Sequence, residues 1–298
     1  MNEDAVAPVV AVMLILAIGV TFFAAWNAYY VPSMKAQSEI THLKDVETGF
    51  LRFSSDIETA ASLKKTVRLS EPIPLGGGEF TFNAVKSGGL LRIQNESEGY
   101  MRISIINGTT PVTTSNLLRF SNYSFQPVNN FWQDQGYVWS YGNVNVTKGS
   151  LSTPLLYTSM DKVTYRMTRS LFDLDMVPSR DDPAVCSLMN VYIVNMTPAA
   201  GHTTSSGNGN GMLVLESTVT NQQFTNATSM TLRINPGIPE GFRSALWNSV
   251  NLRVNESLSC RNVHAVSNSS NLEIQMMFDT IPNMTLNRKT IEIVLGTD

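Results

Sequence analysis

The residue types that most often carry catalysis or bind metals are few in this sequence and widely separated. Its three histidines, His42, His202 and His264, lack the short spacings of zinc ligands. The sequence contains no Gly-x-Ser-x-Gly, His-Glu-x-x-His or paired-cysteine motif. We therefore predict a protein that is not an enzyme, with no catalytic residues, no metal site and no cofactor.

Two segments resemble ion-binding or phosphate-binding loops but have simpler explanations. Asp173, Asp175, Asp181 and Asp182 could offer oxygen ligands to Ca²⁺, but their spacing matches no known calcium loop, and a solvated turn is the better interpretation. The glycine-rich segment 205–211 precedes an expected strand, whereas a phosphate-binding loop opens a helix. We expect the tip of a hairpin there.

Aromatic residues are densest in the segment 123–141. Rings of this size most often fill the core between two sheets, and we take this as the default interpretation. The alternative is an exposed platform that binds carbohydrate or another surface.

Two cysteines and nine glycosylation motifs bear on the compartment of the protein. Cys186 and Cys260 would form a disulfide in an oxidising compartment, and two buried free thiols are the alternative. An Asn-x-Ser/Thr motif accepts an N-linked glycan only in an exported chain. The nine motifs begin at Asn95, Asn107, Asn122, Asn145, Asn195, Asn226, Asn255, Asn268 and Asn283.

The elements that position these residues begin with a long apolar segment. No charged residue occurs between Asp4 and Lys35, and the segment 5–31 is long enough to cross a bilayer as a helix. Trp26 and two tyrosines cluster near its end, where amphipathic rings prefer the lipid–water boundary. A cleaved signal peptide would need a basic start, but residues 1–4 are acidic. We predict a transmembrane helix.

The orientation of this helix rests on two opposing signals. Lys35, Lys44 and Arg52 follow the apolar segment, and no basic residue precedes it, which favours a cytoplasmic C-terminal part. The glycosylation motifs all lie beyond residue 94, and together with the predicted disulfide they favour an external one. We expect the external orientation.

A second helical pattern follows Pro32, which we expect to kink or interrupt the helix. Residues 33–65 place apolar side chains three and four positions apart and so predict an amphipathic helix with one apolar stripe. The stripe comprises Ile40, Leu43, Val46, Phe50, Phe53, Ile57 and Ala61. The stripe packs against the head, against neighbouring subunits, or against both. Residues 1–67 form a transmembrane and stalk helix in this interpretation.

The remaining residues, 68–298, predict a β-rich head outside the membrane. Short β-forming runs alternate with Gly, Pro, Asn and Ser, which is typical of antiparallel sheets in a sandwich or barrel. These runs are 66–69, 79–83, 90–94, 100–106, 138–146, 162–167, 191–195, 212–220, 229–235, 249–255, 272–278 and 290–295. The charged, proline-containing segment 168–182 is a possible boundary between two lobes. The expected fold class is α+β: a long N-terminal helix, then a mainly antiparallel β-sandwich.

The charge of the chain excludes one large class of partners. The net charge is −3, the pI is about 5.7, and only 15% of residues are charged. A protein that binds nucleic acid through its phosphates usually carries a basic surface. We therefore expect no nucleic-acid partner.

The N-terminal block from Asp4 to Leu14, DAVAPVVAVML, resembles the opening of archaeal type IV pilins and pilin-like proteins. Ala7 and Ala11 stand where that family usually has Ser and Gly. The helix followed by a β-rich head is also similar to that family. The residues that the resemblance assigns to the membrane or filament helix are Ala5, Val6, Pro8, Val9, Val10, Val12, Met13, Leu14, Ile15, Leu16, Ile18, Phe22 and Phe23.

The resemblance implies a structural or adhesive subunit of a surface filament, whose partners are the membrane, like subunits and N-linked glycans. The small residues Ala11, Ala17 and Gly19 would let neighbouring helices approach closely. The implied location is the cell membrane with an extracellular head, or an extracellular filament. The alternative is a membrane-anchored surface glycoprotein that never polymerises and serves in binding or in the cell envelope.

Overall fold

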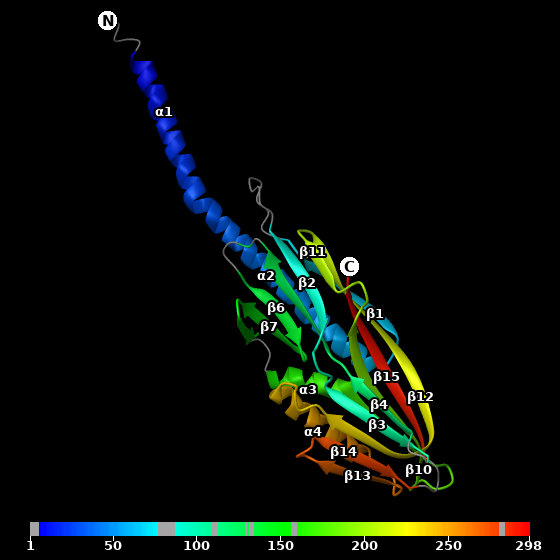
Figure 1. Cartoon of the computed structure of the whole chain (residues 1–298). Helices are drawn as coiled ribbons and strands as arrows, with labels where there is room; N and C mark the ends of the chain where they lie inside the picture. The colour runs from blue at the N-terminus through cyan, green and yellow to red at the C-terminus, as the bar shows by residue number, and fades with distance from the viewer. Residues whose placement is uncertain are drawn as a thin grey trace.

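A computed structural model of the chain describes residues 6–76, 87–108, 112–128, 130, 134–155, 160–279 and 284–298. One continuous helical rod forms its N-terminal part, made of α1 (Val6–Ala25), the π-helical turn η2 (Trp26–Tyr30) and α2 (Val31–Leu63). Figure 1 shows α1 extending away from the head, whereas α2 runs along it. The long helix followed by a sheet-rich head confirms the predicted α+β class.

Pro32 does not interrupt this rod. Proline has no N–H, and its ring collides with the carbonyl of the residue four positions earlier in a regular α-helix. The π-helical turn ends at Tyr30, two positions before Pro32, and the N–H of Val31 donates to the carbonyl of Trp26 across five residues instead of four. The wider turn therefore accommodates the proline, and the expected interruption is replaced by a local change of helical pitch. The rod ends at Lys64, which adopts a left-handed conformation (φ 52°).

The head contains two sheets. The larger has nine strands among the described residues, and the smaller has six. The larger sheet comprises β1 (Val67–Pro74), β3 (Met101–Asn107), β4 (Val112–Leu118), β9 (Phe172–Pro178), β10 (Cys186–Pro198), β12 (Asn210–Ile234), β13 (Val263–Asn268), β14 (Glu273–Phe278) and β15 (Met284–Thr297). The smaller comprises β2 (Gly88–Asn95), β5 (Ser121–Val128), β6 (Gly136–Ser140), β7 (Asn143–Lys148), β8 (Leu151–Pro154) and β11 (Thr204–Gly207).

Strand pairing in the described residues is mostly antiparallel, as expected. The exception is the parallel pair β10–β15, which runs beside the long strand β12. Both sheets mix strands from before and after the segment 168–182: β1 and β3 pair with β12, and β11 pairs with β2. That segment contains β9, an edge strand of the larger sheet, so it does not separate two lobes.

Two expected strands are helices. The run 162–167 belongs to α3 (Met160–Leu171), and the run 249–255 belongs to α4 (Glu240–Ser257). Val250, Leu252 and Val254 alternate like strand residues, but Leu252 is 44% exposed while the two valines are buried. Their burial follows the helical spacing that also buries Leu246. The run 79–83 lies outside the described residues.

The core of the head is built around α2, which contacts β1, β12 and β15 of the larger sheet and β6 and β7 of the smaller one. The predicted stripe is buried from Leu43 to Ala61, whereas Ile40 is 46% exposed. Phe50 packs on Tyr123 with ring centroids 4.9 Å apart. Because the helix fills space between strands of both sheets, the head is a helix-centred two-sheet structure rather than two sheets packed only on each other.

Four aromatic residues of the segment 123–141 fill this core, as the default interpretation predicted, while Phe131 and Trp132 lie outside the described residues. Tyr123, Phe125, Tyr137 and Trp139 are at most 1% exposed. The indole N–H of Trp139 donates to Ser54 of α2 at 2.8 Å. These contacts tie α2 to the smaller sheet and hold the exposed rod rigidly on the head.

Candidate functional site

The surface of α1 is the first candidate site, because it is apolar all the way round. Its eleven large apolar side chains from Val9 to Phe23 are 47–70% exposed. They point in every direction around the helix rather than along one stripe, since no position of the segment 8–30 is buried. A helix of this kind needs a complete apolar surrounding, which a head domain on one side cannot supply.

The length of α1 fits a bilayer. Its 20 residues span about 30 Å at 1.5 Å per residue, which equals the thickness of a hydrocarbon core. Among the described residues, one helix is long and apolar enough to cross a membrane by length and composition. It lies at the N-terminus, and none of its apolar window is buried in the protein.

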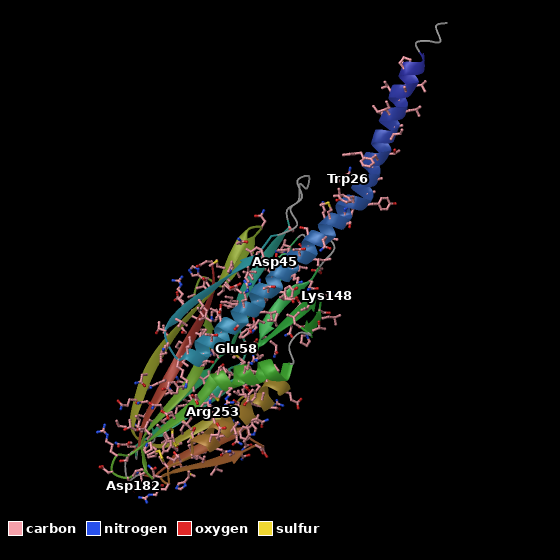
Figure 2. The ribbon with its side chains drawn as sticks, turned by 180° about the vertical axis from the view of Figure 1, so that it is seen from behind. Trp26, Asp45, Glu58, Lys148, Asp182 and Arg253 are labelled. Atoms are coloured by element: carbon pink, nitrogen blue, oxygen red, sulfur yellow. A yellow bond between two sulfur atoms is a disulfide. The ribbon has the colours of Figure 1, made fainter. Side chains whose placement is uncertain are left out.

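Aromatic rings mark the end of this apolar surface. The rings of Trp26 and Tyr30 lie in contact in the π-helical turn, with centroids 4.2 Å apart and a tilt of 36°, and Tyr29 is 80% exposed. Figure 2 shows Trp26 on the part of the rod that extends beyond the head, while Asp45 and Glu58 lie where α2 runs along the head. The rings therefore lie between the apolar part and Lys35, the first charged residue that follows it. Among the residues assigned to this helix, Ala5 lies outside the described part of the chain, and Val6 is the first helical residue.

The two cysteines form the predicted disulfide. Cys186 on β10 and Cys260 after α4 are bonded with their Cα atoms 5.5 Å apart and 74 positions apart in the sequence. The Asn262 side chain reinforces this junction, because its amide accepts from the Cys186 N–H and donates to the Cys186 carbonyl, each at 2.9 Å. Asp182, which pairs with Arg261 next to Cys260, lies at the end of the head remote from Trp26 (Figure 2).

The nine glycosylation motifs have different surroundings. Asn95, Asn226, Asn255 and Asn268 are exposed. Asn107, Asn122, Asn145 and Asn195 are half-buried, and Asn283 lies outside the described residues.

Two of the half-buried asparagines have their amides engaged. Asn195 donates to Glu292 at 2.7 Å, and Asn122 donates to Glu96 at 3.0 Å. A glycan replaces one of the two amide hydrogens, so these two positions are the poorest acceptors in the described chain.

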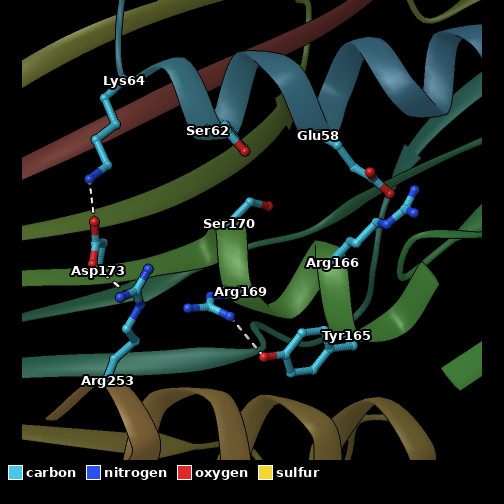
Figure 3. A pocket seen from close by; sticks show the side chains of 10 residues that line it. Glu58, Ser62, Lys64, Tyr165, Arg166, Arg169, Ser170, Asp173 and Arg253 are labelled. Carbon is cyan, nitrogen blue, oxygen red and sulfur yellow. Dashed lines mark hydrogen bonds and ion pairs between the residues drawn. The ribbon is translucent and has the colours of Figure 1, made fainter. Parts of the chain in front are cut away.

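A second candidate site is a hollow of about 410 Å³ between α2, α3, α4 and β9. We call it the arginine hollow, since Arg166, Arg169 and Arg253 line it together with Lys64. Figure 3 shows α3 at its centre, with α2 on one side and α4 on the other. The sequence interpretation missed it because it placed a strand at 162–167, and a strand would not bring Arg166 and Arg169 to one face.

The two carboxylates of the arginine hollow, Asp173 and Glu58, both lie near cations. Asp173 forms ion pairs with Lys64 and, at 3.6 Å, with the Nε atom of Arg253. Burial raises the pKa of Glu58, and the nearby charge of Arg166 opposes that rise. Arg169 pairs with no described carboxylate; its guanidinium donates to the Tyr165 hydroxyl at 2.9 Å. Four cations and two carboxylates line the hollow, and Glu256 pairs with Arg253 beside it at 3.5 Å, so a surplus of one positive charge remains.

The remaining candidate residues have structural surroundings. His42 is buried and bonds the Pro74 carbonyl at 2.8 Å, while His202 and His264 pair with exposed carboxylates. Among the described residues, no group of three or more His, Cys, Asp or Glu is arranged to hold a metal ion. Segment 205–211 leads from β11 in the smaller sheet to β12 in the larger one; because these two strands do not pair with each other, it is a crossover between the sheets and the expected hairpin tip is wrong.

The four aspartates are distributed rather than gathered. Asp173 contacts Lys64, Asp175 accepts from Asn190 at 3.4 Å, and Asp182 pairs with Arg261 at 2.6 Å. Asp173 and Asp175 lie in strand β9, whereas Asp181 and Asp182 lie in the turn that follows it, so the expected solvated turn holds for the last two only.

Comparison with known protein families, with curated proteins and with solved structures found no match to this chain.

Proposed function

We propose that this protein is a structural or adhesive subunit of a surface filament similar to an archaeal type IV pilus, held in the membrane and then in the filament by α1. The observation that carries the proposal is the exposed apolar surface of α1 on a rigid rod. Burying its eleven large side chains is worth roughly 10–20 kcal/mol, since they are already partly covered. That is as large as the whole stability of a typical domain, about 5–15 kcal/mol, so α1 requires a partner environment.

Lipid and a bundle of like helices both meet this requirement. In the membrane, α1 satisfies its backbone internally and exposes apolar side chains to lipid. In a filament, the same side chains exchange lipid for neighbouring copies of α1. The rod passes without a break into α2, and α2 is anchored in the core of the head. Each head would therefore follow the position of its helix in an assembly.

The proposal places the head outside the cell. A disulfide persists in oxidising compartments, and four exposed glycosylation motifs lie in the head. The second candidate function is a non-polymerising surface glycoprotein that is anchored in the membrane. An α1 that is apolar all the way round fits this function as well as it fits a filament, because lipid can surround it as completely as neighbouring helices can.

Gly19 separates the two candidates. A Cβ atom added at this position meets nothing within 4 Å in the subunit, and neighbouring positions of α1 are exposed, so we expect Gly19→Leu to be accommodated in the isolated protein. It would block close approach of a neighbouring helix in a filament. Val20→Leu, the adjacent apolar change, is the matched control.

The test expresses both variants in the native cell and examines filaments sheared from its surface. The filament proposal predicts wild-type and Val20→Leu protein in the filaments, with Gly19→Leu protein retained in the membrane. Recovery of the wild-type chain only as a membrane-bound monomer would exclude the filament role and leave the surface glycoprotein.

A further inference from the structure

A second hollow, of about 690 Å³, adjoins the arginine hollow. It lies between the β6–β7 hairpin, α3 and the start of α4. Every side chain that lines it is uncharged, and three of them are the asparagines Asn143, Asn145 and Asn248, so we call it the asparagine hollow. Tyr165 of α3 lines both hollows and is 44% exposed.

The asparagine hollow combines apolar ring surfaces with amides. Tyr141 and Phe242 line it with ring centroids 4.9 Å apart. The amide of Asn143 donates to Thr164 at 3.2 Å, whereas the side-chain amides of Asn145 and Asn248 bond no other described residue. Each free amide offers donors and an acceptor side by side, which matches adjacent sugar hydroxyls, and an aromatic ring packs on the C–H face of a sugar.

Tyr141 is held in a conformation that tyrosine rarely adopts. It is the first residue of the two-residue hairpin loop between β6 and β7, with φ of +50°, and Gly142 follows at φ +86°. Asn, Asp or Gly normally occupies such a position. Bulky residues in this region of backbone space are outliers that often mark functional positions. Its ring is fixed by stacking on Phe120 at 5.2 Å.

The arginine hollow supplies the complementary feature, a site for a negative charge. Arg169 has no carboxylate partner among the described residues, whereas Arg253 already pairs with Asp173 and, at 3.5 Å, with Glu256. Guanidinium groups bind carboxylate and sulfate oxygens with two parallel hydrogen bonds. Figure 3 shows Arg166 extending toward Glu58 and Arg253 directed toward Asp173, while Arg169 donates to Tyr165.

We propose that the two hollows on either side of Tyr165 form one binding site for an acidic oligosaccharide, with an acidic group in the arginine hollow and a neutral sugar in the asparagine hollow. Their volumes, about 410 and 690 Å³, lie in the range of small-molecule sites. The site belongs to the head and does not depend on polymerisation, so it holds for a filament subunit and for a monomeric surface protein alike.

The test titrates the full chain in detergent micelles, produced in a host without N-glycosylation so that Asn145 is unmodified. The probes are a hyaluronan tetrasaccharide, which alternates glucuronate with N-acetylglucosamine, the neutral chitotetraose, and inorganic phosphate. Calorimetry should show saturable binding that is strongest for the hyaluronan tetrasaccharide and that weakens with salt.

Variants in each of the two hollows test which part of the ligand each hollow binds. Arg169→Gln should weaken hyaluronan binding roughly tenfold, because it removes a charge-assisted hydrogen bond, and leave chitotetraose unchanged. Asn248→Ala should weaken both oligosaccharides. Arg180→Gln, which removes an exposed charge outside both hollows, is the matched control and should change nothing.

Four results would overturn the proposal: no saturable binding of the hyaluronan tetrasaccharide, phosphate binding as tight as hyaluronan binding, an equal loss in Arg180→Gln, or unchanged hyaluronan binding in Asn248→Ala. Unaltered melting temperatures in each variant ensure that a loss reflects the site and not the fold.

Discussion

Removing the disulfide should destabilise the head by an amount that the sequence separation sets. The bond closes a loop of about 75 residues, since Cys186 and Cys260 are 74 positions apart. Chain-entropy theory assigns a loop of that length roughly 4 kcal/mol, because the unfolded chain regains freedom when the link is cut. For a domain of this size that corresponds to a fall of about 8–16 °C in melting temperature.

The double variant Cys186→Ala with Cys260→Ala tests this value, because the other contacts that hold the two segments together remain. Asn262 still bonds both backbone groups of Cys186, and Arg261 still pairs with Asp182 at 2.6 Å. Urea unfolding of the full chain in micelles, compared with wild type with and without reductant, measures the change. A loss below about 1 kcal/mol, or free thiols in alkylated native protein, would refute the reasoning.

Three further outcomes follow from single side chains. Ser54→Ala should cost about 1–3 kcal/mol in urea unfolding, because it leaves the buried indole N–H of Trp139 without an acceptor, whereas the exposed control Ser55→Ala should cost under about 0.5 kcal/mol. Peptide mapping of native protein should find no glycan on Asn195, whose amide is bonded within the sheet; a glycosylated Asn195 would contradict its placement. Burial raises the pKa of Tyr141 to about 12, so the folded state keeps this proton more tightly than the unfolded state does. The stability that this pKa shift contributes is present below about pH 10 and is lost as the pH rises toward 12. Tyr141→Phe, which lacks the titrating hydroxyl, should therefore lose less stability than wild type between pH 8 and pH 11. An identical loss in the variant and the wild type would contradict the raised pKa of Tyr141.

The helical rod was predictable because its signals are local. Thirty consecutive uncharged positions and a three-to-four spacing from Leu43 to Ala61 each predict one element without knowledge of the rest of the fold. The π-helical turn before Pro32 was not predictable from the sequence. A helix can accommodate a proline by a kink, a break or a wider turn, and packing decides which of these occurs.

The head was predictable in class but not in arrangement. Alternating β-forming residues predict strands, but the pairing of β1 with β12 joins residues such as Val67 and Ser217, and nothing local encodes such a distance. The helix α3 was missed because Val163, Thr164 and Tyr165 favour strands by propensity, while tertiary packing buries Met167 and Leu171 at helical spacing.

The candidate sites also differ in whether local sequence is enough to predict them. The apolar surface of α1 and the disulfide partners follow from sequence, because one is a continuous segment and only one pairing exists for two cysteines. The arginine hollow could not be predicted, because Arg253 reaches it from α4 and Lys64 from the end of α2. One partial signal existed: Arg166 and Arg169 are three positions apart, which is one helical face.

The measurement that tests the central account most directly is structure determination by electron cryo-microscopy of filaments sheared from the native cell surface. The account predicts filaments that contain this chain, with α1 packed among copies of itself at the axis and the heads outside. Filaments that lack the chain, or that hold it with α1 exposed to water, would contradict it.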